Sequence, residues 1–251
     1  MHGRAPIGLP LLLVIVAGLA CAAEPRLPTH AQAGRAVLFD GKTLAGWNGD
    51  PAHWSVQDGA ITGTAERLKG SFLLSEQEYD DFRLTMYSRM KQSNNHSGLC
   101  MWGPRPPTGT WFPFRCILVI PPSGGMWDYN QGKGGIKGQK VASPAIPKNR
   151  WHRVEILARR STGEIRAAFD GIEVVRYKDP EPSRLVRGPI GLQLHGGRQA
   201  QAVQYKDIVI EPNPKDDRLL TALPARSGVA FQDQWEPRPP AGPQARSDVR
   251  R

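Results

Sequence analysis

The sequence predicts an all-β fold, a sandwich of two curved antiparallel sheets. Short runs of β-branched and aromatic residues alternate with Gly, Pro, Asn and Asp, and no long segment has the periodicity of a helix. Many short antiparallel strands can also close into a barrel, so the hairpins alone leave both architectures open. We expect the sandwich, and no internal repeat indicates a propeller.

The clearest strand is predicted at residues 82–90, where apolar residues alternate with mostly polar ones, so that one face is buried and the other is wet. A hairpin is predicted at 165–177, because Asp170-Gly171 separates two β-rich runs and suits a type I′ turn. Further strands are expected at 151–158, 188–195 and 203–210.

The two ends of the chain differ from this pattern. Residues 1–23 have a basic start, a short apolar stretch and small residues, which predict a signal peptide and export to the periplasm or cell surface. Cys21 lies in a sequence that resembles a lipoprotein cleavage site without the usual large aliphatic residue, so the exported protein is either lipid-anchored there or soluble. We expect one domain over 34–211 and a flexible Pro- and Arg-rich tail over 212–251.

The chain is strongly basic, with a formal net charge of +10 and a sequence pI near 9.8. Clustered Lys and Arg would attract nucleic acid or acidic glycans. The charges are scattered, however, and export removes most access to nucleic acid, so we predict no nucleic-acid partner. The excess is interpreted as a solvated surface, with anionic cell-surface partners left open.

Two cysteines remain in the predicted domain, Cys100 and Cys116. If 97–102 pairs with 114–120, a hairpin centred near Thr108 places them opposite one another. A cross-strand disulfide is then feasible in an exported protein, and two buried free thiols are the alternative.

Candidate functional residues occur on the predicted strand at 188–195. Gln193 and His195 share one face of this strand, whereas the alternating apolar residues share the other. On a curved sheet the polar face can form a concave binding surface, where His195 could act as a base or a ligand. The alternative is an ordinary surface histidine at a strand end.

A glycine-rich loop at 123–135 carries aromatic, carboxylate and amide side chains. Aromatic rings cover the C–H faces of sugars, and polar groups bind their hydroxyls, so this loop is a candidate sugar site as well as an ordinary flexible loop. The predicted substrate-binding residues are Gln193, Trp127, Tyr129, Asn130, Trp111 and Lys133.

Metal chemistry has weak sequence support. His96 could join His195 and Asp128 around a divalent cation, but their spacing matches no short metal motif. A divalent metal is therefore the one cofactor considered, and its identity is unknown. The sequence contains no nucleophile elbow, phosphate-binding loop or Cys-x-x-Cys motif.

The chain resembles the 3-keto-disaccharide hydrolase domain family over roughly Val37 to Glu211. The similar segments are 38–47, 54–63, 79–84, 97–99, 149–152, 169–171, 188–196 and 205–208. The resemblance implies a concanavalin A-like or laminin-G-like jelly roll that cleaves glycosides already oxidised to a ketone at the third sugar carbon. The ketone acidifies the adjacent C–H, so that a base can start an elimination, and water then adds to the product.

On this resemblance, the catalytic residues would be His195 as base or ligand, Asp128 as a residue that orients hydroxyls together with Gln193, and Arg115 or a divalent cation as stabiliser of the enolate. The sequence departs from the family where many relatives read Tyr-Glu-x-Gln-Ile, because the acidic residue and the amide are replaced by Arg115 and Ile117. The rival hypotheses are a non-catalytic carbohydrate-binding module and a structural cell-surface protein.

Overall fold

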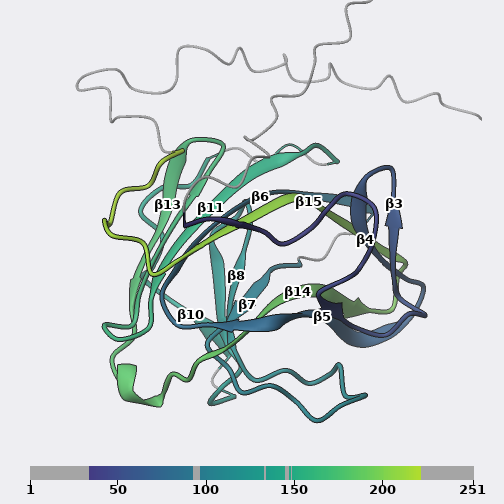
Figure 1. The fold of residues 1–251 in the computed structure, drawn as a ribbon, viewed down its shortest axis with the longest axis horizontal. Coiled ribbons are helices and arrows are strands. Elements are labelled where there is room, and N and C mark those ends of the chain that lie inside the picture. The colour runs from purple at the N-terminus through teal and green to yellow at the C-terminus, as the bar shows by residue number, and fades with distance from the viewer. Residues whose placement is uncertain (1–33, 93–96, 133, 145–146, 148, 222–251) are drawn as a thin grey trace, which may run out of the picture.

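The computed structural model describes residues 34–92, 97–132, 134–144, 147 and 149–221. They form two antiparallel sheets stacked face to face, so the predicted all-β sandwich is confirmed (Figure 1). The only helical element among these residues is a short 3-10 turn, η1 (Pro182–Arg184). Within the same ranges, no helix has the length and hydrophobicity needed to cross a membrane.

Sheet A has eight strands and sheet B has seven. Sheet A runs in the order β13 (Ile172–Lys178), β12 (Glu164–Phe169), β11 (His152–Arg159), β6 (Phe82–Gln92), β15 (Gln201–Pro212), β4 (Ala60–Ala65) and β3 (Trp54–Gln57), with β1 (Ala36–Val37) also paired to β15. Sheet B runs in the order β10 (Gly134–Ile136), β9 (Gly125–Asp128), β8 (Ile117–Ile120), β7 (Leu99–Met101), β14 (Gly188–Gly197), β5 (Leu68–Tyr79) and β2 (Trp47–Asn48).

The strands predicted from alternation form as expected. In β6, Phe82, Leu84 and Met86 are buried between the sheets. The β12–β13 hairpin turns at Asp170 and Gly171, which both have positive φ as a type I′ turn requires. In β14, Leu192 and Leu194 enter the core between the sheets, so the alternate residues of this strand face outward.

Hydrogen bonds across the core fix how the two sheets lie on each other. The Tyr205 hydroxyl of β15 donates to the Gln193 carbonyl of β14 at 2.8 Å, and the Trp54 indole of β3 donates to Ser71 of β5 at 3.1 Å. Tyr205 and Trp54 are both buried. A buried Tyr or Trp needs such a partner for its polar atom, and here the partners come from the opposite sheet.

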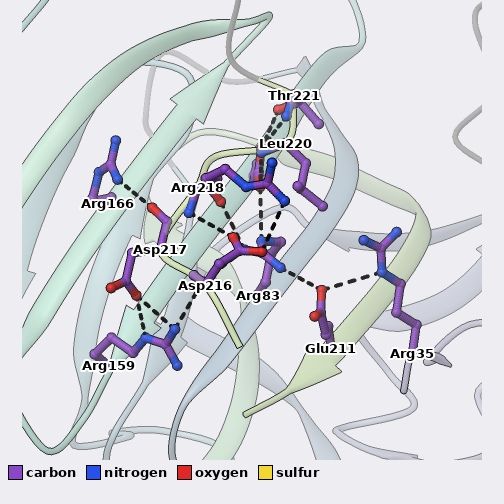
Figure 2. Close-up of polar contacts among 11 residues, drawn as sticks. Arg35, Arg83, Arg159, Arg166, Glu211, Asp216, Asp217, Arg218, Leu220 and Thr221 are labelled. Carbon is purple, nitrogen blue, oxygen red and sulfur yellow. Dashed lines mark hydrogen bonds and ion pairs between the residues drawn. The ribbon is translucent and has the colours of Figure 1, made fainter. Parts of the chain in front are cut away.

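A C-terminal strap, residues 213–221, crosses the outer face of sheet A (Figure 2). Glu155 is fully buried and accepts hydrogen bonds from the backbone N–H groups of Leu220 and Thr221, at 2.8 and 2.7 Å. Arg83 pairs with Asp216 at 2.9 Å and also donates to backbone oxygens of the strap. The strap belongs to the segment expected to be a flexible tail, yet buried charged groups hold it to the sheet.

The strap contacts predict a measurable stability difference. We expect Glu155→Gln to lower the free energy of unfolding by about 2–3 kcal/mol, because it weakens three charge-assisted hydrogen bonds and the 3.4 Å ion pair with Arg83 in a buried setting. Urea denaturation would measure the loss. The control is Glu164→Gln, which removes a half-exposed pair with Lys178 and should change stability by less than about 1 kcal/mol. Equal losses in the two variants would contradict this account.

Candidate functional site

The outer face of sheet B carries most of the sequence-predicted site residues. The strand register aligns Leu74, Gly191, Cys100, Leu118 and Trp127 in one row across five strands. Gln193 lies opposite Phe72 in the next row of β14 and β5, and His195 lies opposite Gly70 in the row after that. Gln193 and His195 therefore share this face, as the alternation of the strand predicts.

His195 is half-buried near one end of this face, where its backbone N–H donates to the Ser97 hydroxyl at 3.1 Å. Desolvation by the surrounding protein lowers the pKa of His195 below its ordinary value of 6.5, and a backbone hydrogen bond at Gly196 opposes this only in part. The imidazole is therefore predominantly neutral at pH 7. A neutral imidazole with partial solvent access can accept a proton.

An aromatic loop, residues 102–116, joins β7 to β8 and covers part of the same face. The Phe112 ring lies against Gly70, where an added Cβ would come within 2.7 Å of it, and Gly70 is the pairing partner of His195. Phe112 stacks on Phe72 with centroids 6.2 Å apart and remains 44% exposed. An exposed aromatic ring thus lies at the same end of the face as His195.

Phe112 is not among the site residues predicted from the sequence, although it lies in the aromatic run 111–114. The neighbouring Trp111 is a predicted site residue, and it is half-buried with its indole donating to Asn48 at 2.9 Å. The fact that the loop folds back over β5 is what places Phe112 beside His195. This requires the register of β5 and β14, which the sequence pattern alone does not supply.

Gln193 is only 3% exposed and lies opposite Phe72, a member of a second hydrophobic cluster on this face. Its side chain forms a hydrogen bond with Tyr129 that acts to lower the tyrosine pKa, but burial has the larger effect, so the pKa of Tyr129 is raised. Tyr129 also stacks with Trp127, with ring centroids 6.3 Å apart. The cluster around them contains Phe72, Leu74, Cys100, Phe114, Cys116, Leu118 and Ile120.

Asp128 does not join this face. Met126, two residues earlier in β9, is part of the core between the sheets, and Asp128 continues on that side of the strand. Its carboxylate pairs with Arg184 at 3.0 Å and accepts the backbone N–H of Asn130 at 2.9 Å. Asp128 instead lines a separate cavity of about 230 Å³, together with Tyr177 and Arg184.

Arg115 and Asn130 lie toward the far end of sheet B from His195. Arg115 is exposed and its guanidinium donates to the Asn130 carbonyl oxygen at 3.1 Å. The Asn130 side chain donates to the carbonyl of Trp102, just beyond the end of β7. Ile117, which stands at the other departure from the family pattern, points into the core between the sheets. Lys133 and His96 lie outside the described residues.

Metal ligands do not gather on this face among the residues that the structure describes. In those ranges no three His, Cys, Asp or Glu residues are close enough to hold an ion. The residues of β7 and β8 that face outward are Cys100, Leu118 and Ile120, and of these only Cys100 has a ligand atom. The divalent cation stays a prediction, and no chemical step is assigned to it.

Comparison with known proteins identifies the family. The model of a family described as 3-keto-alpha-glucoside-1,2-lyase-like domain matches residues 34–211 of the chain. The chain belongs to this family. The match confirms the resemblance predicted from the sequence. No curated protein matches the chain.

Solved structures share the fold of this lyase-like domain. Two candidate glycosyl hydrolases from Parabacteroides distasonis superpose with TM-scores of 0.53 and 0.52, at 17% and 20% identity. They align over 72% and 71% of this chain and 94% and 98% of their own. The carbohydrate-binding module CBM66 from Bacillus subtilis superposes with a TM-score of 0.50 at 15% identity, over 66% of this chain and 95% of its own.

The environment of His195 predicts its titration. We expect its pKa, measured from imidazole NMR shifts against pH, to lie below 6.5, with the resonance assigned by its loss in His195→Gln. Because the unfolded chain would bind this proton more readily, the histidine's contribution should make the fold less stable as pH falls below about 6.5. A pKa at or above the ordinary value would show that the side chain is not desolvated.

Proposed function

We propose that the protein cleaves 3-keto-glycosides, or a related oxidised sugar, by elimination followed by hydration, with His195 as the base. The observation that carries the proposal is the placement of a half-buried, predominantly neutral histidine beside an exposed aromatic ring. Membership of a family described as 3-keto-alpha-glucoside-1,2-lyase-like supports the substrate class. Among the solved structures with this fold are one named as a candidate glycosyl hydrolase and one named a carbohydrate-binding module, and these names support a carbohydrate ligand.

The proposed reaction needs few protein groups because the ketone of the substrate itself activates the C–H bond that must be broken. The ketone acidifies the adjacent C–H, and the neutral His195 imidazole accepts that proton. The electron pair of the C–H bond becomes a carbon–carbon double bond while the glycosidic C–O bond breaks. The leaving oxygen takes a proton from the imidazolium or from water, and water then adds across the double bond, so that the net reaction is hydrolysis.

The other residues of the face have binding and positioning roles in this proposal. Phe112 offers an exposed ring for the C–H face of a sugar bound next to His195. Gln193 is too buried to touch such a sugar, so it acts as a positioning residue that holds the Tyr129 hydroxyl. Asp128 and Arg115 are left out of the catalytic group, because their side chains are engaged elsewhere.

The activity can be tested by aglycone release from a panel of 3-keto-glucosides, with the full chain and with and without divalent metals. We expect His195→Gln to lower kcat/KM by at least about 100-fold, since general-base catalysis contributes that much or more. The matched control is His53→Gln, which alters a histidine that contacts Thr64 and Asp50 next to sheet A and should leave the rate unchanged. Full activity of His195→Gln would remove the histidine from the mechanism.

The aromatic ring predicts a different kinetic signature. Phe112→Ala should raise KM about tenfold while kcat changes much less, because the ring contributes binding rather than proton transfer. Steady-state kinetics on the same substrates separates the two parameters. A fall in kcat with unchanged KM would show that Phe112 acts in the chemical step and not as a platform.

A non-catalytic carbohydrate-binding module is the second candidate function. The specific observation in its favour is that Cys100, Leu118 and the buried Gln193 occupy the middle of the face, which leaves little accessible polar surface there. Calorimetric binding of unoxidised and 3-keto sugars to the wild-type chain distinguishes the two functions. Binding without any aglycone release favours the module, and release that depends on His195 favours the enzyme.

A further inference from the structure

Cys100 and Cys116 are in contact on the outer face of sheet B. Both side chains are fully buried in the second hydrophobic cluster, and both are free thiols in this structure. The two thiols are joined by a hydrogen bond between their side chains. No role in the proposed reaction requires either of them.

The strand register explains how they meet. Cys100 pairs with Leu118, so Cys116 is its diagonal neighbour, two residues along the chain from the directly opposed position. The sequence-based expectation that the cysteines lie directly opposite each other is therefore wrong by two residues. Diagonal neighbours in a regular ladder have Cβ atoms roughly 7 Å apart, whereas a disulfide requires about 4 Å. Cys116 lies just before β8 begins, so the ladder does not fix its distance from Cys100, and the hydrogen bond between the two thiols shows that the sulfur atoms are within reach of each other.

The backbone is tightly packed at this same point. A Cβ added to Gly103 would lie 1.5 Å from the Arg115 carbonyl oxygen and 3.1 Å from the Cys116 Cα. The two ends of the aromatic loop are thus in direct backbone contact beside the cysteine pair. Only glycine allows this approach, which brings the two ends of the loop together at the point where a bond between the thiols would join them covalently.

We propose that Cys100 and Cys116 form a disulfide in the exported protein and that this bond closes the base of the aromatic loop. The oxidant is an external disulfide of the glutathione or protein type, which is reduced to two thiols as the two cysteine S–H bonds are replaced by one S–S bond. The bond pins the loop segment that carries Trp111, Phe112 and Phe114 over the outer face of sheet B. The proposal does not depend on the proposed enzymatic function.

The bond forms before the loop packs on the sheet. Thiolates are the reactive species in disulfide exchange, and burial raises the pKa of Cys116 well above its ordinary value. Both sulfurs are also shielded from a reagent, because neither side chain is exposed. Chain that folds without an oxidant should therefore keep its thiols and resist later oxidation, whereas chain that folds with an oxidant should contain the disulfide.

The test is to unfold the reduced full chain and refold it with and without a mixture of oxidised and reduced glutathione. Trypsin cleaves after Arg115 and so separates peptide 92–115, with Cys100, from peptide 116–133, with Cys116. We expect these two peptides to appear linked by a disulfide in the non-reduced map of the oxidatively refolded chain. Cys21 falls in a different tryptic peptide, so mispairing with it would be recognised.

The stability readout is independent of the peptide map. The Tm of the oxidatively refolded chain should fall by about 5–10 °C on reduction, because a bond across a loop of this length restricts the unfolded chain. The Cys100→Ser and Cys116→Ser variants should show no reductant-dependent shift. Alkylation of both Cys100 and Cys116 in protein that has folded under the oxidising conditions would overturn the proposal. A peptide map in which Cys21 is linked to Cys100 or to Cys116 would overturn it as well.

Discussion

The arrangement of the two sheets depends on the hydrogen bond that the Tyr205 hydroxyl donates to the Gln193 carbonyl. This bond crosses the core at a fully buried tyrosine and fixes β14 of sheet B against β15 of sheet A. Because side chains in a strand alternate, fixing the apolar residues of β14 toward the core also fixes Gln193 and His195 on the outer face. The position of the candidate base therefore follows from core packing.

The two outer faces of the sandwich are covered in different ways. On sheet A, the C-terminal strap is held chiefly by the buried charges of Arg83, which Figure 2 shows, and of Glu155. On sheet B, the aromatic loop covers an apolar cluster and leaves His195 and Phe112 accessible at one end. The contacts of the first kind hold a segment of the chain in place, whereas a partly exposed aromatic ring beside a neutral imidazole suits a sugar.

Much of the fold and part of the site could be predicted from the sequence. The alternation in β6 and β14 and the Asp170-Gly171 turn are local signals, and each one appears in the structure where the pattern placed it. The outward direction of His195 follows from the same alternation. These predictions succeed because the residues of these strands that face the core between the sheets are apolar, and only one register places all of them there.

The remaining features depend on contacts between distant segments. Asp128 was expected in a loop that lines the site, but its segment forms β9 and the alternation there turns its carboxylate toward Arg184. Cys100 pairs with Leu118, two residues away from the expected partner Cys116. The pairing was not predictable because a long irregular loop, unlike a two-residue turn, does not fix the register of β7 and β8. The strap was missed because Arg83 and Asp216, far apart in sequence, meet only in the folded chain.

The central claim is that the sugar binds on the outer face of sheet B beside His195. The most direct measurement is a crystal structure of the full-chain His195→Gln variant with a 3-keto-glucoside, in which the substrate cannot turn over. We predict a sugar stacked on Phe112, with the C–H next to its ketone facing residue 195. A sugar found instead in the cavity lined by Asp128, Tyr177 and Arg184 would contradict the account and move the functional site to the other side of the sheet.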